Sequence, residues 1–440
     1  MPGADGAARA AGAGPILDFT IARLGDGRVA SPMSGVRFVS DDERVLYPSS
    51  LRDLRRLQGL DGDCPAMECA GPRARLFFDP AQVACGIVTC GGLCPGLNDV
   101  IRAIVLSLHH HYGVATIYGF RFGFEGLVES SGHQPLRLTT DSVSRIHKAG
   151  GSMLASSRGP QEPAAMVDYL RKLGVGLLFA IGGDGTLRGA HAISEEAARR
   201  GEPIAVVGVP KTIDNDVSFV QKTFGFETAV AEACRATYAA NVEAEGARNG
   251  IGLVKLMGRD SGFIAAYSVL VDGQVNFCLI PEVPFTLEKL LAALRQRLER
   301  RGHAVIVVAE GAGQDLMATR GERDASGNVK YGDIGAFLRD AILRSFKESG
   351  TPISLKYIDP GYAIRSAPAI PHDSGFTLLL GQNAVHAGMT GRTDMVVGFW
   401  NHQFTHVPIA LAVSARKRID PEGTLWSSVL ASTGQPHDLC

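Results

Sequence analysis

The chain has 440 residues, of which 45% are hydrophobic and 20% are charged, and its formal net charge is −1 at pH 7. This length exceeds a single hydrophobic core and predicts two or three domains of an ordinary globular protein. The balanced charge argues against a basic surface that binds nucleic acid or an acidic membrane, and no apolar run has the length to cross a bilayer.

The N-terminal region carries no recognisable chemistry. Residues 1–15 are rich in Ala and Gly and lack the apolar segment of a secretory signal, so we expect a disordered tail. A transit peptide is the alternative, although the tail contains Asp5 and no Ser. Residues 16–80 form an N-terminal extension, with a short helix expected at 50–60 and an extended stretch at 76–78. The eight cysteines form no C-x-x-C pair, so we expect reduced thiols and a cytoplasmic protein.

From Val83 onwards, apolar runs of four to eight residues alternate with segments of helical period. This alternation predicts parallel βαβ units and an open α/β sheet. The expected strands are 85–89, 114–120, 176–181, 204–209, 251–257 and 305–309. Ligands of open α/β sheets bind beyond the carboxyl ends of the strands, so we expect the chemistry to follow these runs.

A glycine-rich turn, Gly182-Gly183-Asp184-Gly185-Thr186, follows the third run. Glycine lets the backbone approach a ligand closely, and the N–H groups that open the helix expected at 187–200 can hold an anion. Because Asp184 would itself repel a phosphate, we interpret it as the ligand of a metal that bridges to one. The turn therefore predicts a Mg-polyphosphate site. The alternative is a tight strand–helix turn that needs its glycines for packing alone.

Two other glycine-rich segments are candidate phosphate sites. Residues 89–98 (TCGGLCPGLN) follow the first strand, and Asn98 would cap the next helix. Residues 150–159 carry Arg158 between Ser and Gly, which suits a phosphate clamp. A solvated loop arginine is the alternative for Arg158.

Carboxylates and arginines follow the remaining strands. The run at 204–209 leads into the segment Pro210-Lys211-Thr212-Ile213-Asp214-Asn215-Asp216, whose two carboxylates suit general-base catalysis or metal binding. The alternative is a hydrated turn that caps the backbone. Met257-Gly258-Arg259 and Glu310 follow two later strands, and a polar loop at 357–365 (YIDPGYAIR) precedes a helix expected at 376–387.

Two basic clusters are interpreted as surface features. The triple His109-His110-His111 is typical of a solvated helix C-terminus, where positive charge is favourable. Arg416-Lys417-Arg418 is interpreted as an exposed charged end.

Together these motifs resemble the phosphofructokinases, both ATP-dependent and pyrophosphate-dependent. The matching segments, in family order, are Gly91-Gly92-x-x-Pro95-Gly96-x-Asn98, Gly182 to Thr186, Pro210 to Asp216, Met257-Gly258-Arg259, Glu310 and Tyr362-x-x-Arg365. They span about residues 83–401, and residues 70–102 look particularly like the long enzymes of plants and trypanosomatids.

The resemblance implies that the chain transfers a phosphoryl group to the 1-hydroxyl of fructose 6-phosphate in glycolysis, with Mg²⁺ held by Asp184. Asp214 would be the catalytic base, and Arg259 and Lys211 the other catalytic residues. The implied donor positions are Gly92, Arg158, Gly159, Gly183, Asp184, Gly185 and Thr186. The implied sugar-phosphate positions are Thr212, Ile213, Asp214, Met257, Gly258, Arg259, Glu310, Tyr362 and Arg365. The chemistry agrees, because phosphoryl transfer depends mainly on positioning and charge neutralisation.

The identity of the phosphoryl donor depends on two positions. Pyrophosphate enzymes of the family usually carry Asp where this chain has Gly185, and a carboxylate there would repel the α-phosphate of ATP. Lys211, in contrast, is typical of pyrophosphate enzymes. We favour ATP, because a side chain at position 185 would exclude the α-phosphate outright, whereas one added cation at Lys211 does not exclude either donor. Pyrophosphate is the alternative. A second alternative is a non-catalytic regulatory relative that binds sugar phosphate or nucleotide, against which Asp184, Asp214 and Arg259 argue.

The resemblance also implies two Rossmann-like three-layer α/β domains with mostly parallel sheets and the active site in the cleft between them. The expected divisions are a donor domain at 81–225 completed by 363–395, a sugar-phosphate domain at 226–362, and a C-terminal segment at 396–440. A homodimer or homotetramer is expected by analogy. Short bacterial enzymes have an intersubunit Arg where this chain has Gly250, and a His where it has Tyr362, so their effector control is not assumed.

Overall fold

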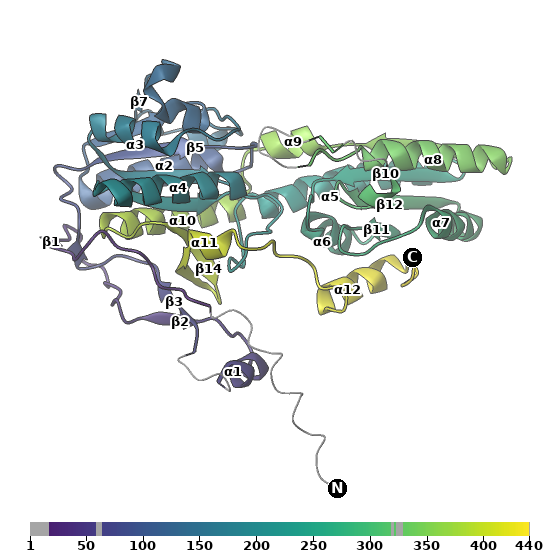
Figure 1. Ribbon diagram of the computed structural model, residues 1–440. Coiled ribbons are helices and arrows are strands. Elements are labelled where there is room, and N and C mark those ends of the chain that lie inside the picture. Colours follow the sequence, from purple (N-terminus) through teal and green to yellow (C-terminus); the bar gives the residue numbers. More distant parts are fainter. Residues whose placement is uncertain (1–16, 59–63, 318–320, 323–328, 440) are drawn as a thin grey trace, which may run out of the picture.

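The computed structural model describes residues 17–58, 64–317, 321–322 and 329–439, so the tail expected at 1–15 lies outside the described residues. Two lobes lie side by side, each built on a sheet covered by helices (Figure 1). Within the described ranges, no helix combines the length and the hydrophobicity needed to cross a bilayer.

The first lobe contains a nine-stranded sheet in the order β2-β3-β15-β14-β9-β8-β5-β6-β7. Its strands are β2 (Arg44–Leu46), β3 (Ala66–Cys69), β5 (Ala84–Thr89), β6 (Thr116–Phe120), β7 (Leu136–Arg137), β8 (Val175–Gly182), β9 (Ala205–Pro210), β14 (Met395–Trp400) and β15 (Gln403–Pro408). The five central strands β14, β9, β8, β5 and β6 run parallel, and the outer strands are antiparallel. Burial on both faces explains why the central strands are continuous apolar runs.

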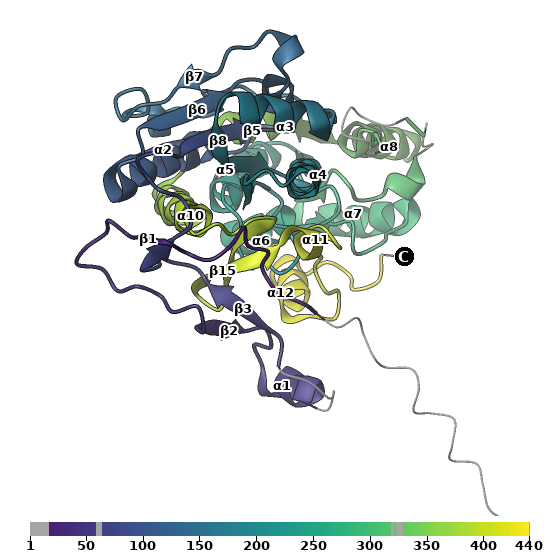
Figure 2. The same cartoon turned by 60° about the vertical axis from the view of Figure 1, so that its left-hand side comes forward.

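Helices cover both faces of this sheet. One core contains side chains of α2 and α10, and the core of the opposite face contains side chains of α3, α4 and α11. The bounds are α2 (Leu97–Ser107), α3 (Pro163–Lys172), α4 (Asp184–Arg200), α10 (Pro371–Met389) and α11 (Ile409–Ala412). The layers are also visible from a second direction (Figure 2).

The second lobe contains a parallel four-stranded sheet in the order β11-β12-β10-β13. Its strands are β10 (Gly250–Leu256), β11 (Phe277–Leu279), β12 (His303–Ala309) and β13 (Ser354–Ile358). Side chains of α5 and α6 pack on one face and those of α7 and α8 on the other. The bounds are α5 (Phe226–Glu245), α6 (Phe263–Asp272), α7 (Leu287–Arg301) and α8 (Ile334–Glu348); α9 (Gly361–Ser366) lies between the lobes in Figure 1.

Both ends of the chain contribute to the first sheet. In the N-terminal region, β1 (Val29–Ala30) pairs with β4 (Arg75–Leu76), and α1 spans Leu51–Gln58. Strand β3 pairs with β15 and β2 pairs with β3, so these two strands extend the nine-stranded sheet at one edge. After α11 the chain crosses to the second lobe, where α12 (Thr424–Thr433) packs against α6 (Figure 1).

The six strands predicted from apolar runs are observed as β5, β6, β8, β9, β10 and β12. The prediction that Asn98 caps the next helix was wrong. The cap position of α2 is Gly96, whose positive φ of 92° suits glycine. Asn98 lies in the first turn instead, where its side chain accepts a hydrogen bond from Met153 N at 2.8 Å and donates to Ala149 O at 3.0 Å. The His triple forms a π-helical turn after α2, and His109 and His110 are exposed as predicted.

Candidate active site

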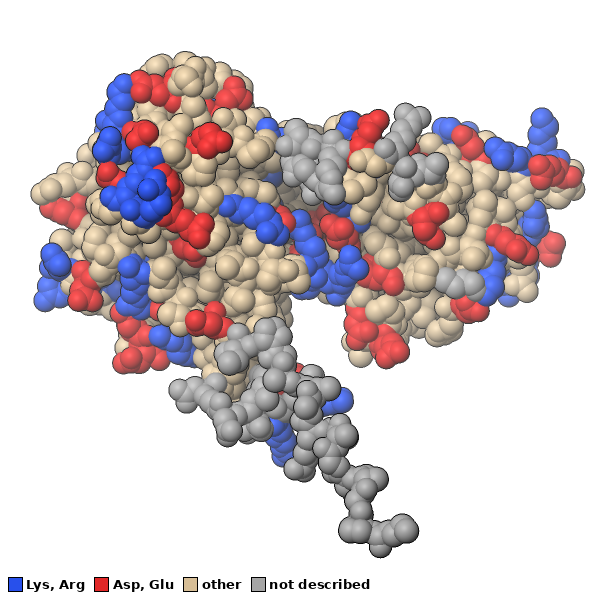
Figure 3. Space-filling model, in the orientation of Figure 1, with Lys and Arg blue, Asp and Glu red and all other residues tan. Residues whose placement is uncertain are grey.

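A cavity of about 1150 Å³ lies between the two lobes. Its walls are the loops after β5, β8 and β9 of the first lobe, together with residues that follow β10 and β12 of the second. Because these neighbouring strands are parallel, their carboxyl ends meet at one edge of each sheet. Lys and Arg side chains gather in the hollow between the lobes (Figure 3). In the part of the chain that the structure describes, the cavity is lined by six Lys and Arg residues and by six Asp and Glu residues, and the cations among them can pair with an anionic ligand.

The turn after β8 opens the helix α4 towards the cavity. Because α4 begins at Asp184, directly after the cap residue Gly183, its first N–H groups can serve as an anion site. A Cβ atom at Gly182 would lie 2.1 Å from Thr186 Oγ1, so packing alone requires glycine there. A Cβ atom at Gly185 would have no heavy atom of the described residues within 4 Å. Packing therefore does not account for Gly185, which leaves open space beside the cavity.

The loop after β5 brings two cations close to this turn. Gly91 adopts a positive φ of 85°, and its carbonyl accepts a hydrogen bond from Ser156 Oγ at 2.6 Å. A Cβ atom at Gly92 would lie 3.5 Å from the guanidinium of Arg158. Lys211, only 7% exposed, donates a hydrogen bond to the carbonyl of Gly92. Burial lowers the pKa of Lys211, because the charged form has little solvation there. The negative charge of a bound polyphosphate would stabilise that charged form.

The turn after β9 presents Asp214 with an unused acceptor atom. Thr212 Oγ1 shapes the turn, since it donates to Asp216 at 2.6 Å and accepts from Asp214 N at 3.2 Å. Asp214 Oδ1 is buried and has no hydrogen-bond partner among the described residues. Burial, aided by the charges of Asp216 and Glu310, raises the pKa of Asp214 to about 8. A carboxyl group with a pKa near neutrality and a free acceptor oxygen can take up a proton from a ligand.

The second lobe supplies the facing wall. Strands β10 and β12 are paired so that Leu256 lies opposite Ala309, and Arg259 and Glu310 therefore follow neighbouring strand ends. Gly258, directly before Arg259, has a positive φ of 122°, and a Cβ atom there would lie 2.6 Å from a backbone oxygen. The guanidinium of Arg259 lies over the ring of Tyr331, 4.4 Å from its centroid. An arginine and a carboxylate thus follow two neighbouring strands and line the same cavity.

Most of the predicted site residues line this single cavity. They are Gly92, Arg158, Gly159, Gly183, Asp184, Gly185, Thr186, Lys211, Thr212, Ile213, Asp214, Arg259, Glu310 and Arg365. Three others do not. Met257 is 3% exposed in the core, Gly258 shapes the backbone, and Tyr362 is 89% exposed on α9, so substrate contacts of these three stay predictions.

One cluster was interpreted wrongly: Arg416 and Lys417 are not part of an exposed end. Arg416 Nη1 lies 2.9 Å from Asp216 Oδ2, and Arg416 Nη2 lies 3.4 Å from Asp184 Oδ2. Lys417 Nζ donates to the carbonyls of Val220 and Gln221, both at 3.0 Å. No local sequence pattern identifies Arg416 as a site residue. It lies at the cavity only because β14 and β15, which precede it, return the chain to the first sheet.

The carboxylates in the cavity fit a magnesium ion that is shared with a polyphosphate. Asp184 and Asp216 contact the same guanidinium, so they lie on one side of the cavity. Among the described residues, no group of three or more His, Cys, Asp or Glu could hold a metal. Mg²⁺ usually needs one or two carboxylates together with substrate phosphates rather than a cage made only of protein ligands. The residues present therefore match a metal that enters with its phosphate ligand.

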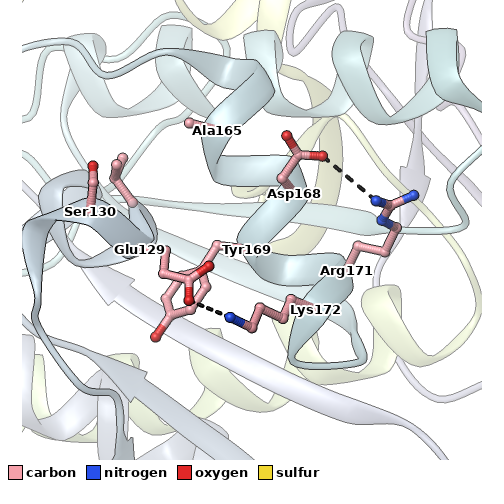
Figure 4. A pocket seen from close by; sticks show the side chains of 8 residues that line it. Glu129, Ser130, Ala165, Asp168, Tyr169, Arg171 and Lys172 are labelled. Carbon is pink, nitrogen blue, oxygen red and sulfur yellow. Dashed lines mark hydrogen bonds and ion pairs between the residues drawn. The ribbon is translucent and has the colours of Figure 1, made fainter.

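A second cavity, of about 620 Å³, lies beside α3 and away from these strand ends (Figure 4). Its charged groups pair with each other: Lys172 with Glu129, and Arg171 with Asp168 at 3.9 Å. With two cations among its described residues, each paired with a carboxylate, this cavity offers an anion fewer partners than the cavity between the lobes, which has six.

Comparison with known proteins identifies relatives of the whole chain. The phosphofructokinase family model matches residues 84–388. The ATP-dependent 6-phosphofructokinase of Borreliella burgdorferi is 46% identical, over 96% of this chain and 97% of its own. That of Trypanosoma brucei brucei is 48% identical, over 90% of this chain and 82% of its own. The solved pyrophosphate-dependent phosphofructokinase of Marinobacter aquaeolei covers 81% of this chain and 92% of its own, with a TM-score of 0.66; at 20% identity it shows a shared fold.

Proposed function

This chain belongs to the phosphofructokinase family, and from that premise we propose that it is an ATP-dependent 6-phosphofructokinase. It would transfer the γ-phosphoryl group of ATP to the 1-hydroxyl of fructose 6-phosphate and so form fructose 1,6-bisphosphate in glycolysis. The observation that carries this proposal is the unpaired Oδ1 of Asp214 in a cavity with a glycine-rich phosphate turn on one wall and Arg259 on the other.

The first lobe would bind the donor. The backbone N–H group of Gly185 at the start of α4, together with Arg158, would hold the phosphates. Asp184 would hold Mg²⁺, which neutralises phosphate charge as the phosphoryl group is transferred. Lys211, close to the carbonyl of Gly92, would add a positive charge at the same phosphates.

The second lobe would bind the acceptor and present its hydroxyl to Asp214. Arg259 and Arg365 would pair with the sugar phosphate or with the charge that develops during transfer, and Glu310 would accept hydrogen bonds from sugar hydroxyls. Asp214 Oδ1 would accept the proton of the 1-hydroxyl as the oxygen attacks phosphorus. Because a carboxylic acid cannot act as this base, the ionised form of Asp214 is the active one.

The choice of ATP depends on the open space at Gly185. The absence of a side chain there leaves room for the α-phosphate, whereas a carboxylate would enter that space and repel it. The relatives that are named ATP-dependent, at 46–48% identity over nearly the whole chain, support the same donor. Lys211 is the observation that favours pyrophosphate instead.

A coupled assay with fructose 6-phosphate and Mg²⁺ tests the proposal directly. We expect turnover with ATP and little or none with pyrophosphate. Turnover with pyrophosphate alone would refute the donor, and no turnover with either, in protein that still binds nucleotide, would indicate a regulatory binding protein. We also propose a homodimer or homotetramer in the cytoplasm, and light scattering after size-exclusion chromatography measures the oligomer.

A further inference from the structure

The segment between α11 and α12 carries a basic side chain into the cleft. It crosses from the first lobe to the second (Figure 1) and is fixed at several points on the way. A β-bridge joins Arg416 to Val217, and Lys417 N donates to Asp216 O at 2.8 Å. Further along, Ile419 N donates to Glu282 Oε1 of the second lobe at 2.9 Å. These main-chain contacts fix the Cα atom of Arg416 beside the turn after β9, from which its side chain reaches Asp184 of the donor turn.

The guanidinium of Arg416 lies where the proposed chemistry requires a cation. It bridges Asp216 at 2.9 Å and Asp184 at 3.4 Å, and Asp184 is the predicted metal ligand. Arg188 also approaches the same oxygen of Asp184 at 3.4 Å. In this arrangement the arginines of the protein itself neutralise the carboxylates that would otherwise attract a divalent cation.

We propose that Arg416 is a positioning residue of the donor site, which competes with the free divalent cation for Asp184 and Asp216 and pairs with the donor phosphates once a metal–nucleotide complex has bound. This inference rests on the proposed function and extends it, because none of the predicted site residues lies in the C-terminal segment.

The preference arises from the number of acceptors available to the guanidinium of Arg416. A free divalent cation at Asp184 displaces Arg416 from a carboxylate and supplies no anion in exchange, so its binding is opposed. A metal–nucleotide complex brings phosphate oxygens, which match the planar fork of arginine and accept its hydrogen bonds. The flexible stem of the side chain allows this exchange while the backbone stays fixed. The site would therefore bind the complex in preference to the bare ion.

The test compares two affinities that move in opposite directions. In Arg416→Met we expect Mn²⁺ alone, measured by the electron paramagnetic resonance of the free ion, to bind about tenfold more tightly than in the wild type, and the magnesium complex of a non-hydrolysable ATP analogue, measured by calorimetry, to bind about tenfold more weakly. Arg416→Lys keeps the charge without the fork and should lie between the two. Arg418→Met, an exposed arginine on the same segment, is the matched control and should change neither affinity.

The outcomes separate this inference from the proposed function. If Arg416→Met changes both affinities in the same direction, or changes neither relative to Arg418→Met, the inference is refuted. A melting curve identifies variants that are unfolded, and Arg416→Lys then carries the test. If the affinities shift in opposite directions but the wild type phosphorylates no fructose 6-phosphate, the inference holds while the proposed function fails.

Discussion

Lys211 donates a hydrogen bond to the carbonyl oxygen of Gly92 and so joins the loop after β9 to the loop after β5. Lys211 is 7% exposed and lies among donor positions, where burial lowers its pKa and an anionic ligand would stabilise its charge. We expect Lys211→Met to lower kcat by about two orders of magnitude, the usual effect of removing one group that stabilises transition-state charge. The KM for fructose 6-phosphate should change little, and steady-state kinetics with each substrate varied in turn measure both constants.

The control for this variant is Lys172→Met, which removes a lysine from the second cavity, away from the strand ends. It should leave both kinetic constants close to those of the wild type. If Lys211→Met keeps its kcat but loses thermal stability, Lys211 serves to hold the two loops together and has no part in catalysis.

Asp214 should behave as a general base. We expect Asp214→Ser to lower kcat by about two to four orders of magnitude with little change in either KM, because the base acts on the reacting hydroxyl and not on the rest of the substrate. Asp260→Ser removes another carboxylate that lines the same cavity and should have a small effect. A kcat of Asp214→Ser near that of the wild type would remove Asp214 from the mechanism.

The pH dependence of the reaction should follow the same carboxyl group. Burial, with the charges of Asp216 and Glu310, raises the pKa of Asp214 to about 8, so in the free enzyme the base is largely protonated at neutral pH. We therefore expect kcat/KM for fructose 6-phosphate to rise with pH and to level off above about pH 8. The measurement is a profile of log kcat/KM against pH.

Asp216→Asn tests the assignment of this profile. Removing a neighbouring negative charge lowers the pKa of Asp214, so the acid limb should move to lower pH. An acid limb that does not move would assign the titration to another group.

Short local segments were enough to predict most of the cavity, because its chemistry follows single strands. Asp214 and Asp184 each lie within a few residues of a buried strand, and parallel pairing brings those strand ends together without further information. Arg416 could not be predicted in this way, since its partners Asp184 and Asp216 are about 200 residues away and nothing local distinguishes it from a surface arginine.

The N-terminal extension shows the same limit. Its polar, glycine-containing sequence indicated no place in the first sheet, yet β3 pairs with β15, near the other end of the chain, and β2 pairs with β3, so both strands extend that sheet. Such contacts between distant segments depend on tertiary packing, so local hydrophobic periodicity does not predict them.

Gly185 should control the donor and leave the acceptor unaffected. Because a side chain there meets open space, Gly185→Asp should fold normally while its carboxylate repels the phosphates of ATP. We expect the KM for ATP to rise by about an order of magnitude or more, with little change for fructose 6-phosphate. Gly185→Asn has nearly the same shape without the charge and should weaken ATP less. Equal losses for both substrates in Gly185→Asp would show that position 185 supports the structure only.

Arg392 should hold the N-terminal extension on the first lobe. Its side chain is 2% exposed, and it donates hydrogen bonds of 2.7 Å to Glu68 and Asp41 of the extension. Arg392→Met removes one of the cations that pair with the buried carboxylate of Glu68. Breaking a buried ion pair costs about 3–5 kcal/mol of unfolding free energy. Chemical denaturation at pH 7 measures this loss. Arg37→Met, which removes an exposed arginine paired with Glu43 in the same extension, should cost less than about 1 kcal/mol.

The loss in Arg392→Met should also depend on pH. Although burial of Glu68 opposes ionisation, hydrogen bonds from His406 and Arg392 hold the pKa of its carboxyl well below the usual range. A lowered pKa in the folded state stabilises the protein above the pKa of the unfolded chain, and this stabilisation is lost as the pH falls. The wild type should therefore lose stability faster than Arg392→Met between pH 7 and the acid range, and the difference between the two should shrink. A difference that stays constant down to acid pH would indicate that Arg392 stabilises the extension by packing, with no contribution from its charge.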